Sequence, residues 1–277
     1  MHTGAELIDE LDARATRFKT ACGPQANMVW RRWGTGRPVV LLHGGAGSWM
    51  HWVRNIEPLA RTRTAWVPDM PGFGDSDLPR EGLDADSIAP MVLDGLHALL
   101  KGAHFDLVGF SFGSLVAALI AAAAPPGLDR LVLVGGSGNG LLKGPPQLKS
   151  LRGVTDPQQR AEVLRFNLNA MMLHHPESID ALALAVQERS ALREKVRGRT
   201  QVMTDMMLRV APQWRCAAYG VWGREDFAYR DNFERLVEVV AGLGLRETVF
   251  MEDAGHWLQY ERSEAFNALL LHFLESV

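Results

Sequence analysis

The chain has 277 residues, of which 47% are hydrophobic and 22% charged, so it is long enough to form one large domain with a sizeable core. Its 29 Lys and Arg residues and 32 Asp and Glu residues leave a formal charge of −3, without the basic surplus typical of nucleic-acid binding. The longest apolar run, residues 114–126, is too short to cross a bilayer. We therefore expect neither a nucleic-acid partner nor a membrane.

Two cysteines, Cys22 and Cys216, are too few for a disulfide framework or a four-thiolate zinc site. They are expected to be free thiols in a reducing compartment. The N-terminal stretch lacks the apolar core of a secretory signal. These features predict a cytoplasmic protein, with residues 1–27 forming a leader or edge segment ahead of the folded core.

Short apolar runs bounded by Gly, Pro and Asp alternate with helical patterns along the chain. Such runs suit strands buried on both faces, and their alternation with helices predicts an α/β fold with a mostly parallel sheet covered on both sides. The predicted strands are an antiparallel edge near residues 29–33, then residues 39–42, 65–67, 106–108, 131–134, 218–222 and 248–251. The predicted helices are residues 51–60, 87–101, 114–124, 231–241 and 264–274.

The alternation breaks between about residues 141 and 212. Helices are expected there at residues 157–174, 178–197 and 201–210. An insertion at the carboxyl edge of a parallel sheet lies over the place where such sheets bind ligands, so we predict a helical lid at 141–212 between core segments 28–140 and 213–277. Its charged residues are interpreted as the solvated faces of helices; they include Arg189, Arg193, Glu194, Lys195, Arg197 and Arg199.

Residues 109–113 (GFSFG) lie between a predicted strand and an alanine-rich helix. A strand that turns directly into a helix holds the central residue in a strained conformation and projects its side chain from the sheet edge. Glycines two residues to either side allow the strand and the helix to cross closely. The pattern predicts Ser111 as a nucleophile; the alternative is a helix-capping serine.

A serine hydroxyl needs a base that removes its proton, and the base needs an acid that fixes its tautomer. Of the nine histidines, His256 follows the last predicted strand through a short turn, at the same sheet edge as Ser111. The turn after the preceding strand supplies Glu225 and Asp226, of which Asp226 is preferred. The order Ser111, Asp226, His256 is the nucleophile–acid–base order of one particular enzyme fold.

A glycine-rich loop, residues 41–47 (LLHGGAG), ends the first long predicted strand. Backbone amides are good donors to an oxyanion because they are already in place, and we assign this role to the amides of Gly45 and Phe112. The alternative of a phosphate-binding loop fails because neither Gly-Lys-Ser/Thr nor G-x-G-x-x-G occurs. His43 is expected to brace the loop.

Five motifs in order, LLHGGAGSW, DMPGFGDS, GFSFG, VWGREDF and DAGHW, together resemble the α/β-hydrolase superfamily over about residues 28–275. The resemblance implies a mostly parallel sheet of about eight strands with a helical cap inserted after the sixth. A serine nucleophile excludes the branch that uses aspartate. No cofactor and no metal are expected.

A closer resemblance is to the carbon–carbon hydrolases that cleave ring-fission products of aromatic catabolism. It rests on GHWLQYE and on Phe266, Asn267, Trp49, Trp52, Arg54 and Asn55. Two features depart from that group: the turn at Ser111 reads Ser-Phe-Gly-Ser instead of Ser-Met-Gly-Gly, and no proline occurs between His43 and Trp49. The group holds a substrate carboxylate with an arginine of the cap, for which Arg189 or Arg193 is the candidate.

We therefore expect a cofactor-independent serine hydrolase that attacks an ester or similar carbonyl of a small, largely apolar molecule. One alternative is carbon–carbon hydrolysis of a ring-fission dienoate, which the same three residues would support. Another alternative is a ligand receptor with the same fold and very slow turnover, because proteins that share a fold can differ in function. The residues predicted to line the substrate pocket are Trp49, Phe110, Phe112 and Trp257.

Overall fold

The computed structural model describes residues 2–80, 84–142, 144, 146–193, 195–196 and 199–276. Within them one sheet has eight strands: β1 (Thr16–Gly23), β2 (Ala26–Trp33), β3 (Arg37–Leu42), β4 (Arg63–Asp69), β5 (Phe105–Phe110), β6 (Leu128–Val134), β7 (Ala217–Gly223) and β8 (Glu247–Met251). Their order across the sheet is β1-β2-β4-β3-β5-β6-β7-β8. β2 pairs antiparallel with both β1 and β4, and the remaining neighbours are parallel.

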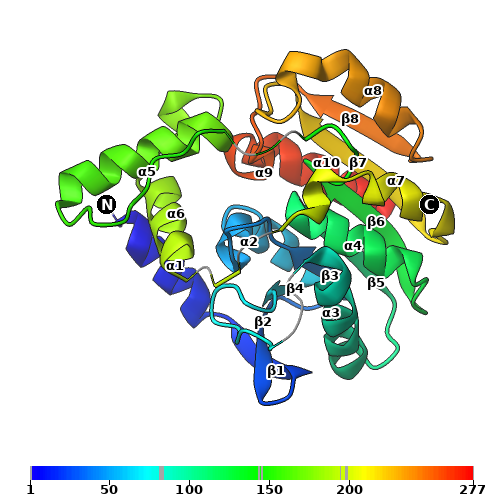
Figure 1. The fold of residues 1–277 in the computed structure, drawn as a ribbon. Helices are drawn as coiled ribbons and strands as arrows, with labels where there is room; N and C mark the ends of the chain where they lie inside the picture. The colour runs from blue at the N-terminus through cyan, green and yellow to red at the C-terminus, as the bar shows by residue number, and fades with distance from the viewer. Residues whose placement is uncertain are drawn as a thin grey trace.

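Helices cover both faces of this sheet (Figure 1). The α-helices are α1 (Gly4–Ala13), α2 (Ile56–Ala60), α3 (Ala85–Leu100), α4 (Phe112–Ala122), α5 (Pro157–Met171), α6 (Ala181–Arg193), α7 (Met206–Val210), α8 (Phe233–Ala241), α9 (Leu258–Glu261) and α10 (Ser263–Glu275). The 3₁₀ turns are η1 (Trp49–Trp52), η2 (Pro176–Ser178), η3 (Gln201–Met203), η4 (Ala211–Gln213) and η5 (Arg230–Asn232).

The sheet separates two apolar layers. All six residues of β5 are buried, and successive side chains point to opposite faces, as a strand requires. Leu107 belongs to the buried cluster that includes residues of α3, α4 and α8, whereas Val108 belongs to the cluster that includes residues of α1, α2 and α10. Each such fully buried side chain contributes about 1.5–3 kcal/mol relative to an exposed one. The strand is therefore anchored on both faces, which holds its carboxyl end in a fixed place.

The predicted α/β fold and the helical insertion after β6 are confirmed. α5 begins where Asp156 Oδ2 accepts a hydrogen bond from Gln159 N and Pro157 takes the first helical position. Of the helix predicted for residues 178–197, α6 covers Ala181–Arg193. Glu194 and Arg197, which that prediction included, lie outside the described residues. The helix predicted for residues 201–210 is divided into η3 and α7 by extended backbone at Thr204.

The segment predicted as a leader or edge, residues 1–27, contributes α1, β1 and the first two residues of β2 to the structure. α1 begins with a capping box, in which Thr3 Oγ1 accepts from Glu6 N and Glu6 Oε2 accepts from Thr3 N. Figure 1 shows α1 beside α6, to one side of the sheet. Within the described residues, no helix is both long and apolar enough to cross a membrane.

Candidate active site

Ser111 lies at the turn between β5 and α4, with φ 52° and ψ −117°. This backbone conformation is strained. The surroundings of the turn are also crowded. A Cβ at position 109 would lie 2.3 Å from Gly113 O, and one at position 113 would lie 2.4 Å from His43 O. Glycine is therefore needed at both positions for the strand, the helix and the neighbouring loop to approach one another.

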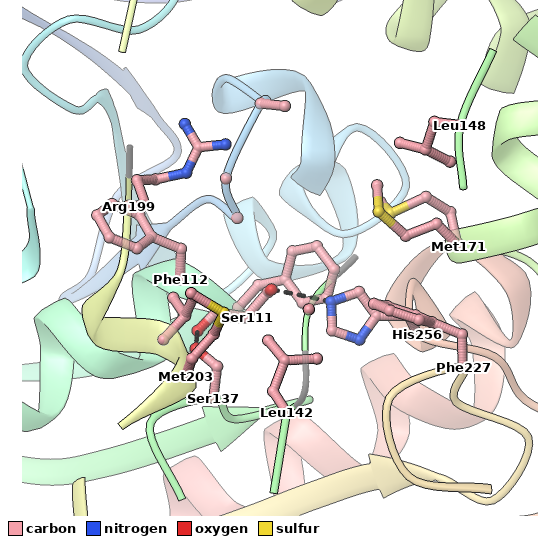
Figure 2. A pocket seen from close by; sticks show the side chains of 17 residues that line it. Ser111, Phe112, Ser137, Leu142, Leu148, Met171, Arg199, Met203, Phe227 and His256 are labelled. Atoms are coloured by element: carbon pink, nitrogen blue, oxygen red, sulfur yellow. Dashed lines mark hydrogen bonds between the residues drawn. The ribbon is translucent and has the colours of Figure 1, made fainter. Parts of the chain in front are cut away.

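The side chain of His256 lies between Ser111 and Asp226. His256 Nε2 is 2.8 Å from Ser111 Oγ, and His256 Nδ1 is 2.7 Å from Asp226 Oδ2 (Figure 2 shows the serine–histidine pair). The three residues follow β5, β7 and β8, so the carboxyl edge of the sheet brings together positions that are far apart in the sequence. Because Nδ1 donates to the carboxylate, Nε2 is free of a proton and can accept one from the serine hydroxyl.

Asp226 is fully buried, and both of its carboxylate oxygens have partners. Oδ1 accepts from Ala228 N at 2.9 Å, in addition to the bond between Oδ2 and His256. The turns that carry the acid and the base touch one another, since a Cβ at position 223 would lie 2.2 Å from Gly255 O. Glu225, the alternative acid, lines a separate cavity of about 70 Å³ that His256 also borders.

The amides of Gly45 and Phe112 both belong to residues that line the cavity around Ser111. Phe112 is the first residue of α4, where the backbone N–H has no acceptor within the helix. Among the described residues, neither of these two N–H groups donates to another protein group. Both amides are thus available to an oxygen that carries negative charge beside Ser111.

His43 supports the loop in the manner expected from the sequence. Its Nδ1 donates to Gly44 O at 2.8 Å, and its Nε2 accepts from Met70 N at 3.0 Å. Complete burial lowers the pKa of His43, which keeps the ring neutral and so able to accept at one nitrogen while it donates from the other.

A cavity of about 420 Å³ opens beside Ser111 and His256 (Figure 2). Its larger apolar side chains come from the turn at Ser111, the lid and the loop that follows β7. They are Phe110, Phe112, Leu142, Leu148, Met171, Met172, Val202, Met203 and Phe227. The polar side chains that join them are Ser111, Ser137, Arg199 and His256. The composition suits a small and mostly apolar ligand.

Two of the predicted pocket residues, Phe110 and Phe112, line this cavity, whereas Trp49 and Trp257 lie elsewhere. The Trp49 ring packs against Trp33 and under the guanidinium of Arg31. Trp49 also borders a different cavity, which is lined by charged side chains. The Trp257 ring is fully buried and stacks on Tyr260 with their centroids 4.1 Å apart. Both indoles are core residues of the apolar layer under the lid.

Among the described residues that line the cavity, the cation is Arg199, and not one of the two arginines suggested by the sequence. Arg189 pairs with Asp9 of α1, and Arg193 pairs with Asp75. The guanidinium of Arg199 lies 5.8 Å from the centroid of the Phe112 ring, and a Cβ at position 45 would be 2.9 Å from Arg199 Nε. The interpretation of Arg199 as part of a solvated helix face is therefore wrong.

Arg199 lies outside the helices of the lid, in the segment between α6 and η3. Its direction depends on how the lid folds back over the sheet, for which the local sequence carries no signal.

The eight-stranded mixed sheet with a helical insertion after β6 is the fold of an α/β hydrolase. Residues 39–269 match the sequence profile described as the Alpha/beta hydrolase family. The chain belongs to this family.

One relative by sequence is the 2-hydroxy-6-oxononadienedioate/2-hydroxy-6-oxononatrienedioate hydrolase of Escherichia coli strain K12. The two are 29% identical over 252 residues, which cover 85% of this chain and 86% of that protein. The fold is similar to that of the meta-cleavage product hydrolase CumD of Pseudomonas fluorescens IP01, with a TM-score of 0.73, 22% identity and coverage of 95% and 98%. It is also similar to that of the esterase RhEst1 of Rhodococcus sp. ECU1013, with a TM-score of 0.71, 22% identity and coverage of 95% and 99%.

Proposed function

We propose that this protein is a cofactor-independent serine hydrolase that attacks the carbonyl group of a small, largely apolar molecule, with a carboxylic ester as the favoured substrate class. The observation that supports this most directly is the position of His256, within hydrogen-bond distance of both the Ser111 hydroxyl and the Asp226 carboxylate. This is the arrangement by which a weakly nucleophilic hydroxyl is activated.

In the proposed reaction, Ser111 Oγ attacks the carbonyl carbon while its proton passes to His256 Nε2. The amides of Gly45 and Phe112 stabilise the oxyanion, and Asp226 stabilises the imidazolium. His256 then gives the proton to the leaving alkoxide as the ester C–O bond breaks, which leaves an acyl-serine. A water molecule attacks the acyl carbon and gives its proton to His256, and Ser111 regains a proton as the carboxylic acid leaves.

The cavity supports a small substrate. Its volume of about 420 Å³ lies in the lower part of the range of pockets that enclose small molecules. Aromatic and methionine side chains surround the reaction centre, so the acyl or alcohol part of the substrate is expected to be apolar.

The replacement Ser111→Ala tests the proposed function. We expect it to abolish turnover of short p-nitrophenyl esters while the thermal unfolding midpoint stays close to that of the unaltered protein, because the hydroxyl is the nucleophile and a methyl group fits the same turn. The measurement is a panel of short and long p-nitrophenyl esters together with a ring-fission dienoate. Full activity of the variant would reject Ser111 as the nucleophile.

A second candidate is the hydrolysis of a carbon–carbon bond in a dienoate that carries a carboxylate. The observation that favours it is Arg199, a cation that an entirely apolar ester pocket does not need. The Escherichia coli relative is a hydrolase of 2-hydroxy-6-oxononadienedioate, an anion, and this is consistent with the second candidate.

A further inference from the structure

A second buried histidine, His51, contacts the loop that carries Gly45. It belongs to η1 and is 2% exposed. Gly44 N donates to His51 Nδ1 at 3.1 Å. The carbonyl oxygen of His51 accepts from Trp257 Nε1 at 2.9 Å, and Trp257 directly follows His256. One buried residue thus binds both the glycine-rich loop and the segment that carries the proposed base.

The loop is folded tightly around the imidazole of His51. A Cβ at position 47 would lie 2.0 Å from its Cε1 and 2.4 Å from its Nδ1, so only glycine fits there. The ring also meets Phe110 edge-on, with centroids 5.3 Å apart, and packs against the Trp257 ring at the same separation. These contacts surround the ring on several sides and hold its acceptor nitrogen against the loop.

Two histidines therefore hold the two peptide groups of Gly44. His51 accepts from the N–H of this residue, and His43 donates to its C=O. In a trans peptide the C=O and the following N–H point in opposite directions. The N–H that follows Gly44 O belongs to Gly45, so the bond from His43 fixes the direction of the Gly45 amide. The bond to His51 fixes the preceding peptide group, and with it the loop backbone from which the Gly45 amide projects.

His51 can accept from Gly44 only while Nδ1 carries no proton. Complete burial lowers the pKa of His51 well below its ordinary range, and the neighbouring His43 and His256 act in the same direction. The acceptor is thus preserved at neutral pH.

We infer that His51 is a positioning residue, which holds the glycine-rich loop so that the Gly45 amide faces the carbonyl group attacked by Ser111. The expected effect on turnover rests on the proposed function, whereas the hydrogen bond between Gly44 N and His51 Nδ1 does not. Removal of one oxyanion donor costs about 10²–10³-fold in kcat, and a displaced donor loses part of that, so we expect a loss of about 10- to 100-fold without this hydrogen bond.

The test compares His51→Leu with His51→Asn. Leucine fills much of the space but has no acceptor, whereas the Asn Oδ1 can occupy the place of Nδ1. For ester hydrolysis, His51→Leu is expected to lower kcat by about 10- to 100-fold with little change in KM, because the interaction matters in the transition state. The affinity for an alkyl boronic acid, which forms a tetrahedral anion on the serine, should fall by a similar factor. His51→Asn should keep most of the kcat and most of the affinity for the boronic acid.

His272→Leu is the matched control, because His272 is exposed and pairs with Glu247 far from the cavity, and it should leave kcat unchanged. Amide hydrogen exchange at Gly44 gives a readout that does not depend on turnover. Exchange should be about tenfold faster in His51→Leu and slow again in His51→Asn. If His51→Leu does not fold, His51→Gln, which lacks an acceptor near the position of Nδ1, takes its place.

Unchanged kcat and unchanged exchange in His51→Leu would overturn the inference while leaving the proposed function intact, provided that Ser111→Ala abolishes turnover. Equal losses in His51→Leu and His51→Asn would also overturn it, because the acceptor would then be irrelevant. Turnover that persists in Ser111→Ala would refute the proposed function instead, and hydrogen exchange would then decide whether His51 holds Gly44.

Discussion

At the scale of single residues, the environments of Asp226 and Glu225 distinguish two adjacent carboxylates. Asp226 is fully buried and hydrogen-bonded through both oxygens, which offsets the cost of removing its charge from water. Glu225 is half-buried and borders the small cavity on another side of His256. Of the two carboxylates, only that of Asp226 is placed to orient the imidazole of His256 through Nδ1.

We predict that Asp226→Asn lowers kcat by up to about 10⁴-fold with the fold retained, because an amide donates to Nδ1 and leaves the proton on the wrong nitrogen of His256. Steady-state kinetics of ester hydrolysis measure the effect. Glu225→Gln is the matched control and should have little effect on kcat. The reverse pattern would transfer the role of the acid to Glu225.

At the scale of elements, ion pairs and backbone contacts join the lid to the rest of the molecule. Arg189 of α6 pairs with Asp9 of α1, and Asp180, just before α6, pairs with Arg54. A Cβ at position 4 would lie 2.2 Å from Ala181 O, so α1 and the start of α6 touch through backbone atoms. The N-terminal helix therefore supports the lid that forms one wall of the cavity.

The lid also brings Arg199 to the cavity, and the replacement Arg199→Met separates the two candidate reactions. A charge-assisted hydrogen bond contributes about 1.5–3 kcal/mol, so we expect KM for a carboxylate-bearing dienoate to rise by about 10- to 100-fold if Arg199 binds that carboxylate. KM for neutral esters should change little. Arg199→Lys, which keeps the charge, is the control, and an equal effect on both substrate types would argue against an anionic substrate.

At the scale of the whole molecule, two buried neutral histidines connect the stability of the fold to pH. His43 and His51 both lie in the interior beside the sheet edge, and burial lowers the pKa of each below the ordinary value of 6.5. Below pH 6.5 the unfolded chain binds protons at these residues that the folded chain does not bind. The folded state is therefore progressively destabilised as the pH falls.

We predict that the free energy of unfolding decreases below pH 6.5 with a slope that approaches about 1.4 kcal/mol per pH unit for each of these histidines, until the pH reaches their folded-state pKa. Urea unfolding at a series of pH values between about 7 and 5 measures the slope. His51→Asn removes one of the two groups and should lower the slope by up to about 1.4 kcal/mol per pH unit, which corresponds to one proton. A slope that this variant does not change would show that His51 takes up a proton equally in both states.

The sequence by itself determined the features that depend on neighbouring residues or on chain order. The glycines around Ser111 identify a strand-to-helix turn, and the turns that end in Asp226 and His256 follow strands whose carboxyl ends share one sheet edge. Strand and helix patterns are local, and parallel strands place their ends together, so the fold and these three positions were predictable.

Only the tertiary structure decided which other side chains reach the cavity. Trp49 and Trp257 belong to two of the motifs in the sequence, yet they are buried in the core, and Arg199 comes from an irregular part of the lid. His51 had no distinctive sequence context, because its bonds to Gly44 and Trp257 exist only once the loop and the last turn are packed together. Contacts of this kind depend on how separate elements pack, which no local periodicity encodes.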